Sequence, residues 1–306
     1  MSIDKLQDLI RKKKNPTVAG LDPRPDYIPP HILDAAIHEK GETLEALADA
    51  FLVFNKGLID ALADVIPAVK PQSACYELLG PAGAAALAET IRYAKEKGLY
   101  VILDVKRGDI GSTAQAYSQA YLGRVPFKGR LLPAYDADSM TVNAYLGSDG
   151  ILPFLQDCQA YDKSIFTLVK TSNPSSGELQ DLITGDRNLY TAVGDLMARI
   201  SRETIGKYGF SSVGAVVGAT YPSDMRTLRK RLENTFFLVP GYGAQGGGAE
   251  DVAPAFNKYG YGAIVNSSRG ILCAWQKDGA GESFGAAART AAIEMREDLR
   301  RVVTVI

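Results

Sequence analysis

The stretch YVILDVK, from Tyr100 to Lys106, decides how the rest of the chain is interpreted. It is an apolar, partly β-branched run that follows Gly98, and Gly98 ends an alanine-rich helical pattern that begins at Pro81. A short apolar run between turn signals is typical of a strand that is buried on both faces. We therefore predict a helix followed by a buried parallel strand, which is the repeating unit of an α/β fold.

The same alternation of short strands and helical patterns extends along the whole chain. No linker or low-complexity segment interrupts it, and every interval between strands leaves room for a crossover helix. Eight such units favour a (β/α)8 TIM barrel, an α/β fold. We expect a single catalytic domain over residues 1–306, with an N-terminal helical extension and loop insertions. The expected strands are 17–22, 68–71, 100–106, 139–143, 164–170, 212–218, 235–239 and 262–266.

Charge and hydropathy exclude several kinds of partner. The 306 residues carry 34 basic and 35 acidic side chains, a net charge of −1, which gives no basic field for nucleic acid or an anionic membrane. No apolar run is long enough to span a bilayer, and the N-terminal MSIDK lacks a signal-peptide core. The three cysteines form no CxxC pair or disulfide framework, so we expect a reducing, cytoplasmic location.

The scarcity of histidine narrows the chemistry. His31 and His38 are the only two histidines, and they lie close together in an N-terminal insertion to which we assign no function. A metal site with several histidine ligands is hard to build from them, and no G-x-S-x-G turn of a serine hydrolase is present. An enzyme with this sequence would use carboxylates, lysines and backbone amides.

Charged residues gather where the strand 100–106 ends, in the sequence DVKRGD. Active groups of this fold lie at the carboxyl ends of the strands. Asp104 and Lys106 are two residues apart, so their side chains project from the same face of the strand. Asp109 follows in the loop, and we expect Gly108 to let the backbone turn so that this carboxylate comes back toward the lysine. A structural ion-pair cluster is the alternative, but buried charge is costly unless function retains it.

Two chemical roles are open to Lys106. A Schiff-base aldolase needs a lysine whose pKa is lowered by burial or by neighbouring cations. Neighbouring carboxylates have the opposite effect and keep the amine protonated. We therefore interpret Lys106 as a cation and proton donor toward a developing carbanion.

A glycine-rich loop, GYGAQGGG at positions 241–248, follows the seventh strand. Its backbone N–H groups can converge on an anion, and Gln245 adds a neutral donor. After the eighth strand, Arg269 offers a guanidinium that can bind phosphate oxygens. The glycine loop alone is also compatible with a surface turn. Together with Arg269, at the recurrent phosphate position of this fold, it predicts a phosphate site.

The segment TSNPSSG, residues 171–177, follows the fifth strand. Its short polar side chains suit the amide edge of a polar heterocycle. They are equally typical of turns and helix N-caps, which is the commoner role of Ser and Asn before a helix. The segment by itself favours the turn.

The run DVKRGDIGST, from Asp104 to Thr113, resembles the D-x-K-x-x-D-I-x-x-T signature of orotidine 5′-phosphate decarboxylases. Further matches follow in the right order over nearly the whole chain, and the sequence is similar to the longer bacterial type of this family. The resemblance implies decarboxylation of orotidine 5′-monophosphate to uridine 5′-monophosphate, in de novo pyrimidine biosynthesis, with no metal or organic cofactor. The other matching segments are GLD at Asp22, VKPQ at Lys70, TSNP at Ser172, PGYGAQGG at Gln245, and Arg269.

The resemblance also implies a role for each matching residue. Lys106 would protonate C6 of the pyrimidine, and Asp104 would lie beside the departing carboxylate. Lys70 and Asp109 would complete an alternating charge network, with Asp109 and Thr113 reaching the site of the other subunit across a homodimer interface. The remaining roles are the ribose hydroxyls for Asp22 and Lys70, the pyrimidine edge for Ser172, and the phosphate for Gln245 and Arg269.

Two alternatives differ in class. A Mg²⁺-dependent sugar-phosphate decarboxylase or aldolase could share the Asp-x-Lys-x-x-Asp barrel, and it would be sensitive to EDTA. A non-catalytic nucleotide-phosphate binder could use the same scaffold. The crowded charges of Lys70, Asp104, Lys106 and Asp109 argue against the binder, because binding alone has no use for them.

Overall fold

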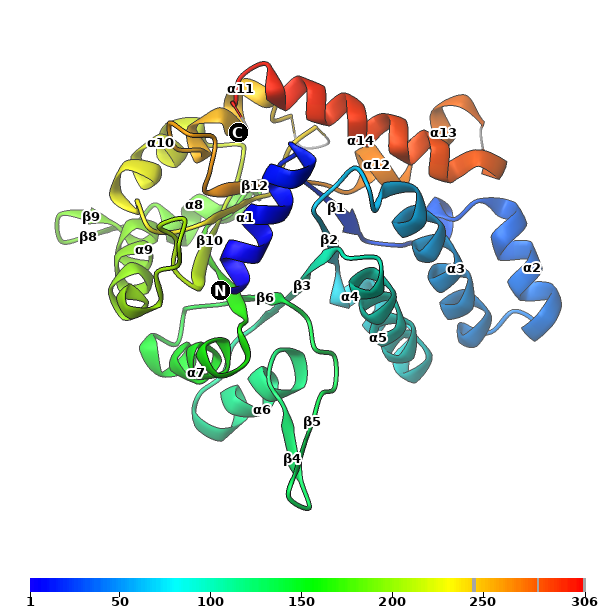
Figure 1. Ribbon diagram of the computed structural model, residues 1–306, viewed down its shortest axis with the longest axis horizontal. Coiled ribbons are helices and arrows are strands. Elements are labelled where there is room, and N and C mark those ends of the chain that lie inside the picture. Colours follow the sequence, from blue (N-terminus) through cyan, green and yellow to red (C-terminus); the bar gives the residue numbers. More distant parts are fainter. Residues whose placement is uncertain (244–245, 280, 305–306) are drawn as a thin grey trace.

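The computed structural model describes residues 1–243, 246–279 and 281–304. Eight parallel strands close into one barrel, in the order β1-β12-β11-β10-β7-β6-β3-β2 (Figure 1). The predicted TIM barrel is thus confirmed, and each of the eight expected runs falls on a barrel strand. The strands are β1 (Thr17–Leu21), β2 (Ala68–Pro71), β3 (Tyr100–Arg107), β6 (Ser139–Val142), β7 (Ser164–Lys170), β10 (Val213–Val217), β11 (Phe237–Val239) and β12 (Ala263–Ser267).

Helices surround the barrel, as Figure 1 shows. The longest, α3, begins after Thr43, whose hydroxyl accepts a hydrogen bond from the Ala46 N–H and so caps the helix. The α-helices are α1 (Ser2–Lys13), α2 (Pro30–Lys40), α3 (Leu44–Leu62), α4 (Ser73–Glu77), α5 (Gly80–Glu96), α6 (Gly111–Tyr121), α7 (Leu152–Tyr161), α8 (Gly177–Gln180), α9 (Leu189–Ile200), α10 (Pro222–Arg231), α11 (Ala249–Val252), α12 (Arg269–Leu272), α13 (Trp275–Asp278) and α14 (Phe284–Arg300).

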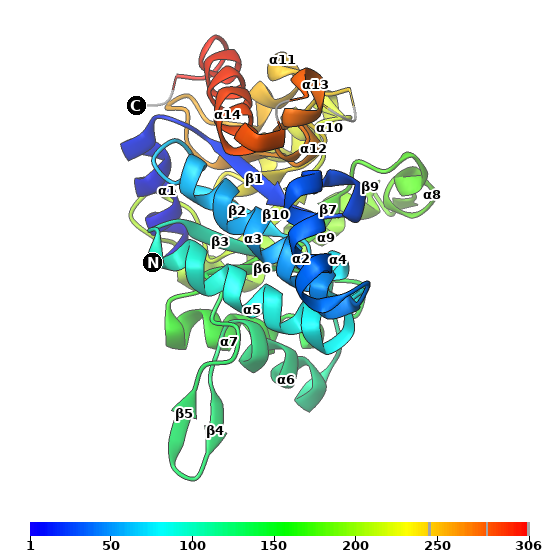
Figure 2. The ribbon, with the colours of Figure 1, turned by 90° about the vertical axis from the view of Figure 1, so that its right-hand side faces the viewer.

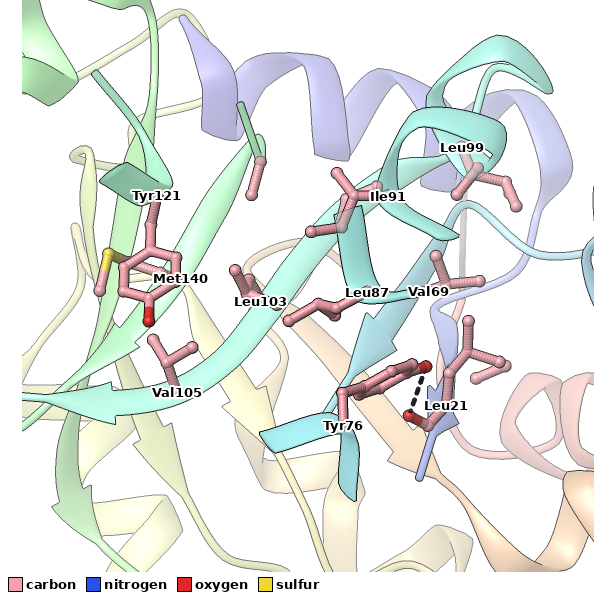
Figure 3. Packing of buried hydrophobic residues seen from close by; sticks show 14 of the residues in the cluster. Leu21, Val69, Tyr76, Leu87, Ile91, Leu99, Leu103, Val105, Tyr121 and Met140 are labelled. Atoms are coloured by element: carbon pink, nitrogen blue, oxygen red, sulfur yellow. Dashed lines mark hydrogen bonds between the residues drawn. The ribbon is translucent and has the colours of Figure 1, made fainter. Parts of the chain in front are cut away.

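Alternate residues of β3 face opposite sides of the barrel wall. Leu103 and Val105 point outward and belong to the same buried cluster as Leu87 and Ile91 of α5 (Figure 3). Ile102 belongs to the separate cluster inside the barrel. The period of two therefore separates an outer layer beneath the helices from an inner layer, and it leaves the inner positions near the carboxyl end for the site.

Helix α1 closes the amino end of the barrel. Ile3, Leu6 and Ile10 are fully buried in the cluster inside the barrel. The Ser2 hydroxyl lies 2.8 Å from the hydroxyl of Tyr100, the first residue of β3. Because this end is filled with side chains, a ligand has access only from the carboxyl ends of the strands.

Two short antiparallel hairpins interrupt the βα order, and the sequence did not predict either. The first pairs β4 (Val125–Phe127) with β5 (Arg130–Leu132) and projects away from the barrel in both views (Figures 1 and 2). The second pairs β8 (Ile183–Thr184) with β9 (Arg187–Asn188), between α8 and α9. Strands of two or three residues carry too little periodic pattern to be recognised from sequence.

Candidate active site

A cavity of about 670 Å³ opens at the carboxyl ends of the strands. Six of the nine predicted site residues line it, and they come from five different strands or the loops that follow them: Asp22, Lys70, Asp104, Lys106, Ser172 and Arg269. Asp109 and Thr113 are not among its lining residues, and Gln245 lies outside the described residues. The barrel thus brings together residues that are more than 200 positions apart in the chain.

The carboxylate of Asp104 lies between two lysines. Lys70 Nζ is 2.8 Å from its Oδ2, and Lys106 Nζ is 2.6 Å from its Oδ1. Asp22 lies further away, 3.8 Å from Lys70 Nζ. Lys70 and Asp104 are buried, whereas nearly half of the Lys106 side chain is exposed. The buried pair Lys70–Asp104 therefore holds a second cation, Lys106, which lines the cavity.

The surroundings shift the pKa values of Lys70 and Asp104 toward their charged forms. Burial lowers the pKa of Lys70, but the charges of Asp104 and Asp22 outweigh this effect and raise the pKa above its ordinary value. Burial likewise raises the pKa of Asp104, but Lys70 and Lys106 outweigh it and hold the pKa well below its ordinary value. Such a site suits a cationic lysine and is unsuited to Schiff-base formation, which needs the neutral amine.

Two residues that the sequence analysis missed complete the surroundings of Asp104. The Thr141 hydroxyl donates to Oδ1 at 2.8 Å, and Gln72 Nε2 donates to Oδ2 at 3.1 Å. The alternation of the strand SMTV places Thr141 with Ser139 on the inner face, and Gln72 lies two positions after Lys70. The period of two was thus the signal that could have identified both residues.

Lys106 leaves the regular strand geometry. Its φ is 46°, in the left-handed region that costs energy for a residue with a side chain. The register with β6 also shifts, because Leu103 pairs with Met140 but Arg107 pairs with Val142. The side chains of Asp104 and Lys106 do lie side by side, as predicted. Both the alternation of the strand and a bulge in β3 contribute to this arrangement.

Asp109 does not return toward Lys106 of its own chain. Its Oδ1 accepts from the Ile110 N–H at 2.8 Å, and among the described residues its carboxylate forms no ion pair within 4.0 Å. The expected turn at Gly108 is therefore wrong within one chain. The reason is that Asn143 N–H donates to the Arg107 carbonyl at 2.8 Å, so the backbone continues beside β6 toward α6. Thr113 is exposed on that helix.

The loop with Ser172 is held by its neighbours. Gln180 accepts from the Thr171 N–H at 2.9 Å and donates to the Thr171 hydroxyl at 2.7 Å. Lys170, which has no exposed surface, forms an ion pair with Asp181. A Cβ at position 218 would lie 2.8 Å from Ser172 Cα, so only glycine allows this approach. Ser172 therefore lines the cavity from a fixed backbone.

Gly241, Tyr242 and Arg269 also line the cavity. Gly241 and Gly243 have φ values of 102° and 71°, which favour glycine. Two buried acceptors, Asp22 Oδ1 and Asn266 Oδ1, have no hydrogen-bond donor among the described residues. Unpaired buried acceptors beside a cavity suit a ligand with hydroxyl groups.

Comparison with known proteins shows the family of this chain. The family model of the orotidine 5′-phosphate decarboxylase / HUMPS family matches residues 53–284. The chain belongs to this family. It is 43% identical over 290 residues to an orotidine 5′-phosphate decarboxylase of Rhodopirellula baltica, covering 93% of this chain and 94% of the relative. It is 39% identical over 305 residues to one of Clostridium acetobutylicum, covering 99% and 100%.

Solved structures of the decarboxylase family are similar as well. The OMP decarboxylase of Leishmania donovani superposes with a TM-score of 0.73 at 33% identity, over 99% of this chain and 98% of that one. The UMP synthase of the same organism gives a TM-score of 0.74 at 34% identity; 98% of this chain is covered, but only 56% of the synthase.

Within residues 1–243, 246–279 and 281–304, no group of three or more His, Cys, Asp or Glu side chains could hold a metal ion. None of the helices in those ranges is long and apolar enough to cross a bilayer.

Proposed function

We propose that this chain decarboxylates orotidine 5′-monophosphate to uridine 5′-monophosphate and CO2, and that Lys106 stabilises and protonates the carbanion formed at C6. The observation that carries this proposal is the Asp104 carboxylate, which bridges Lys70 and Lys106 at 2.8 and 2.6 Å beside the cavity. The family membership supports the reaction, and the charge arrangement supports the role of the lysine.

The chemistry requires a cation at one carbon. When the bond between C6 and the carboxylate breaks, its electron pair stays on C6 in an orbital that the pyrimidine ring cannot delocalise well. A preorganised ammonium group stabilises this charge, and its N–H then supplies the proton that forms the new C–H bond. Solvent reprotonates the amine. Asp104 holds the ammonium group of Lys106 in place beforehand through the bond to its Oδ1, and it lies beside the departing carboxylate.

The remaining cavity residues bind the parts of the substrate that do not react. Asp22 and Lys70 contact the ribose hydroxyls, for which Asp22 Oδ1, which accepts no hydrogen bond from a described residue, is a suitable acceptor. Ser172 binds the pyrimidine edge, and Arg269 with Gln245 holds the phosphate. Binding energy from the phosphate serves to position C6 against Lys106, because the phosphate itself is remote from the reacting carbon.

The active form in this proposal is a homodimer. Asp109 and Thr113 lie outside the cavity of their own chain, and Asp109 makes no ion pair with a described residue of that chain. Both positions are therefore free to complete the site of a second subunit. Ile110, Tyr145 and Leu146 are exposed apolar side chains. Ile110 follows Asp109 directly, and Leu146 and the Asp109 backbone both lie beside Gly150, so an apolar surface near Asp109 suits a contact between subunits.

The proposed location is the cytoplasm. Cys75, Cys158 and Cys273 are all free thiols. Free thiols persist in a reducing compartment, and this supports the proposal.

One assay tests the reaction. The absorbance of orotidine 5′-monophosphate is followed after addition of protein that has been purified in excess EDTA. We expect conversion to uridine 5′-monophosphate at a rate that EDTA does not change. No conversion would contradict the proposed function. Activity that EDTA abolishes and Mg²⁺ restores would indicate the sugar-phosphate type of chemistry instead, and binding without turnover would indicate a nucleotide-phosphate binder.

A further inference from the structure

The hydroxyl of Thr141 joins the two charged residues of β3. It accepts hydrogen bonds from the backbone N–H groups of Val105, at 3.0 Å, and Lys106, at 2.9 Å. It also donates to Asp104 Oδ1 at 2.8 Å. The residue is 1% exposed, so water does not compete for these bonds.

These three bonds use the full capacity of the group. A hydroxyl has one donor hydrogen and two acceptor lone pairs. Because the two backbone groups can only donate, the hydroxyl proton has one remaining partner, the carboxylate of Asp104. The direction of every bond is therefore fixed, and the hydroxyl has no lone pair left for a substrate.

The bonds lie where β3 departs from regular geometry. Lys106 has a left-handed φ of 46°, and its own N–H is one of the two groups that donate a hydrogen bond to Thr141. An unusual backbone conformation persists only where the surroundings hold it. Where the register of β3 with β6 shifts, the Thr141 hydroxyl accepts from two successive N–H groups of β3 and so satisfies both donors.

The carboxylate of Asp104 accepts four hydrogen bonds, one of them from Thr141. Its Oδ1 accepts from Lys106 Nζ and Thr141, and its Oδ2 accepts from Lys70 Nζ and Gln72. A carboxylate offers about four acceptor positions. The four donors occupy all of them, so the Asp104 carboxylate cannot rotate without losing hydrogen bonds. The neutral donor Thr141 and the cation Lys106 share one oxygen.

We propose that Thr141 is a positioning residue for the decarboxylation: its hydroxyl fixes the bulge that presents Lys106 and the orientation of Asp104. The inference rests on the proposed roles of Asp104 and Lys106. Thr141 acts through these two residues and makes no bond with the substrate. A change at Thr141 therefore affects the chemical step more than substrate binding.

The test compares Thr141→Val with Thr141→Ser. Valine keeps the branched shape but removes the hydroxyl, whereas serine keeps the hydroxyl. We expect Thr141→Val to lower kcat at least about 30-fold with KM within about threefold of wild type, because a small displacement at the reacting centre costs rate more than binding. Thr141→Ser should retain kcat within about threefold of wild type.

Thr167→Val is the matched control. Thr167 lies on the neighbouring strand β7, is fully buried, and its hydroxyl makes no hydrogen bond with a described residue. It does not line the cavity. The same chemical change there should leave kcat within about twofold of wild type, since no site residue depends on that hydroxyl.

Amide exchange separates this inference from the function itself. In folded Thr141→Val we expect faster exchange of the Val105 and Lys106 N–H groups than in wild type, whether or not the assay detects turnover. Wild-type kcat in Thr141→Val, an equal loss in Thr141→Ser, or unchanged exchange at these two amides would overturn the inference. Failure of wild-type protein to convert substrate would count against the proposed function alone. If Thr141→Val does not fold, Thr141→Ala takes its place with the same readouts.

Discussion

Lys70 Nζ and Asp104 Oδ2 form an ion pair of 2.8 Å in which both side chains are less than one-tenth exposed. Each group would be costly to bury alone, and each shifts the pKa of the other toward the charged form. The pair therefore contributes to the stability of the fold as well as to the charge of the site. Removal of Lys70 therefore affects both the free energy of unfolding and the charge of the site.

Replacement of Lys70 by Met should destabilise the protein by about 3–5 kcal/mol, because the buried charge of Asp104 loses its buried partner and keeps only the half-exposed Lys106. Chemical unfolding of wild type and variant measures this difference. The pair Lys97–Asp60 provides the control, since both side chains are 40% or more exposed. Lys97→Met should change the free energy of unfolding by less than about 1 kcal/mol. Equal effects of the two substitutions would contradict the structural role of Lys70.

The difference between wild type and Lys70→Met should have a defined pH profile. The pKa of Asp104 is lowered, so its contribution is present above the ordinary value of 3.8 and is lost as the pH falls through the lowered pKa. The pKa of Lys70 is raised, so its contribution is full below the ordinary value of 10.5 and is lost as the pH rises through the raised pKa. Unfolding measured between these values should therefore show a constant difference, and a slope near neutral pH would contradict the assignment.

Replacement of Lys106 by Ala should remove nearly all turnover and leave a folded protein. The Lys106 side chain is 47% exposed, and Asp104 keeps its bonds to Lys70, Gln72 and Thr141. Steady-state turnover and thermal unfolding measure the two effects separately. Substantial residual activity in a folded variant would refute the proposed role of Lys106 as proton donor.

Replacement of Arg269 by Ala should raise KM strongly and lower kcat/KM by about 10- to 100-fold, the effect of losing a charged hydrogen bond of about 1.5–3 kcal/mol. Arg269 lines the cavity at the start of α12. Arg226→Ala is the control, because Arg226 is exposed on α10 and does not line the cavity. An unchanged kcat/KM in Arg269→Ala would exclude this residue from phosphate binding.

Mixing two inactive variants tests the shared site. If Asp109 serves the partner's cavity, a hybrid of Lys106→Ala and Asp109→Ala subunits has one site with both changes and one site with neither. Unfolding and refolding an equal mixture should restore about one quarter of wild-type activity, as random pairing of a twofold dimer requires. Each variant refolded alone is the control. Absence of recovery, with hybrid dimers present, would mean that Asp109 acts in its own chain or in neither.

Much of the fold followed from local pattern. The segments of β2 and β7 were predicted with their observed limits, since an apolar run between turn signals needs no distant partner to be recognised. The two hairpins β4–β5 and β8–β9 were not predicted, because pairs of two or three residues depend on contacts that a period cannot report. Asp109 was expected near Lys106, but the bond from Asn143 to Arg107 directs the chain elsewhere.

The sequence by itself determined which residue types stand at the carboxyl end of each strand, because alternation along a strand and the order of βα units are local properties. From them came the barrel, the position of the cavity and six of the side chains that line it. Only the tertiary structure decided how these groups bond. The four donors around Asp104 come from three strands and a following loop residue, and at the bulge the Thr141 hydroxyl of β6 accepts from the Lys106 N–H. Such bonds depend on distances between segments that no linear pattern contains.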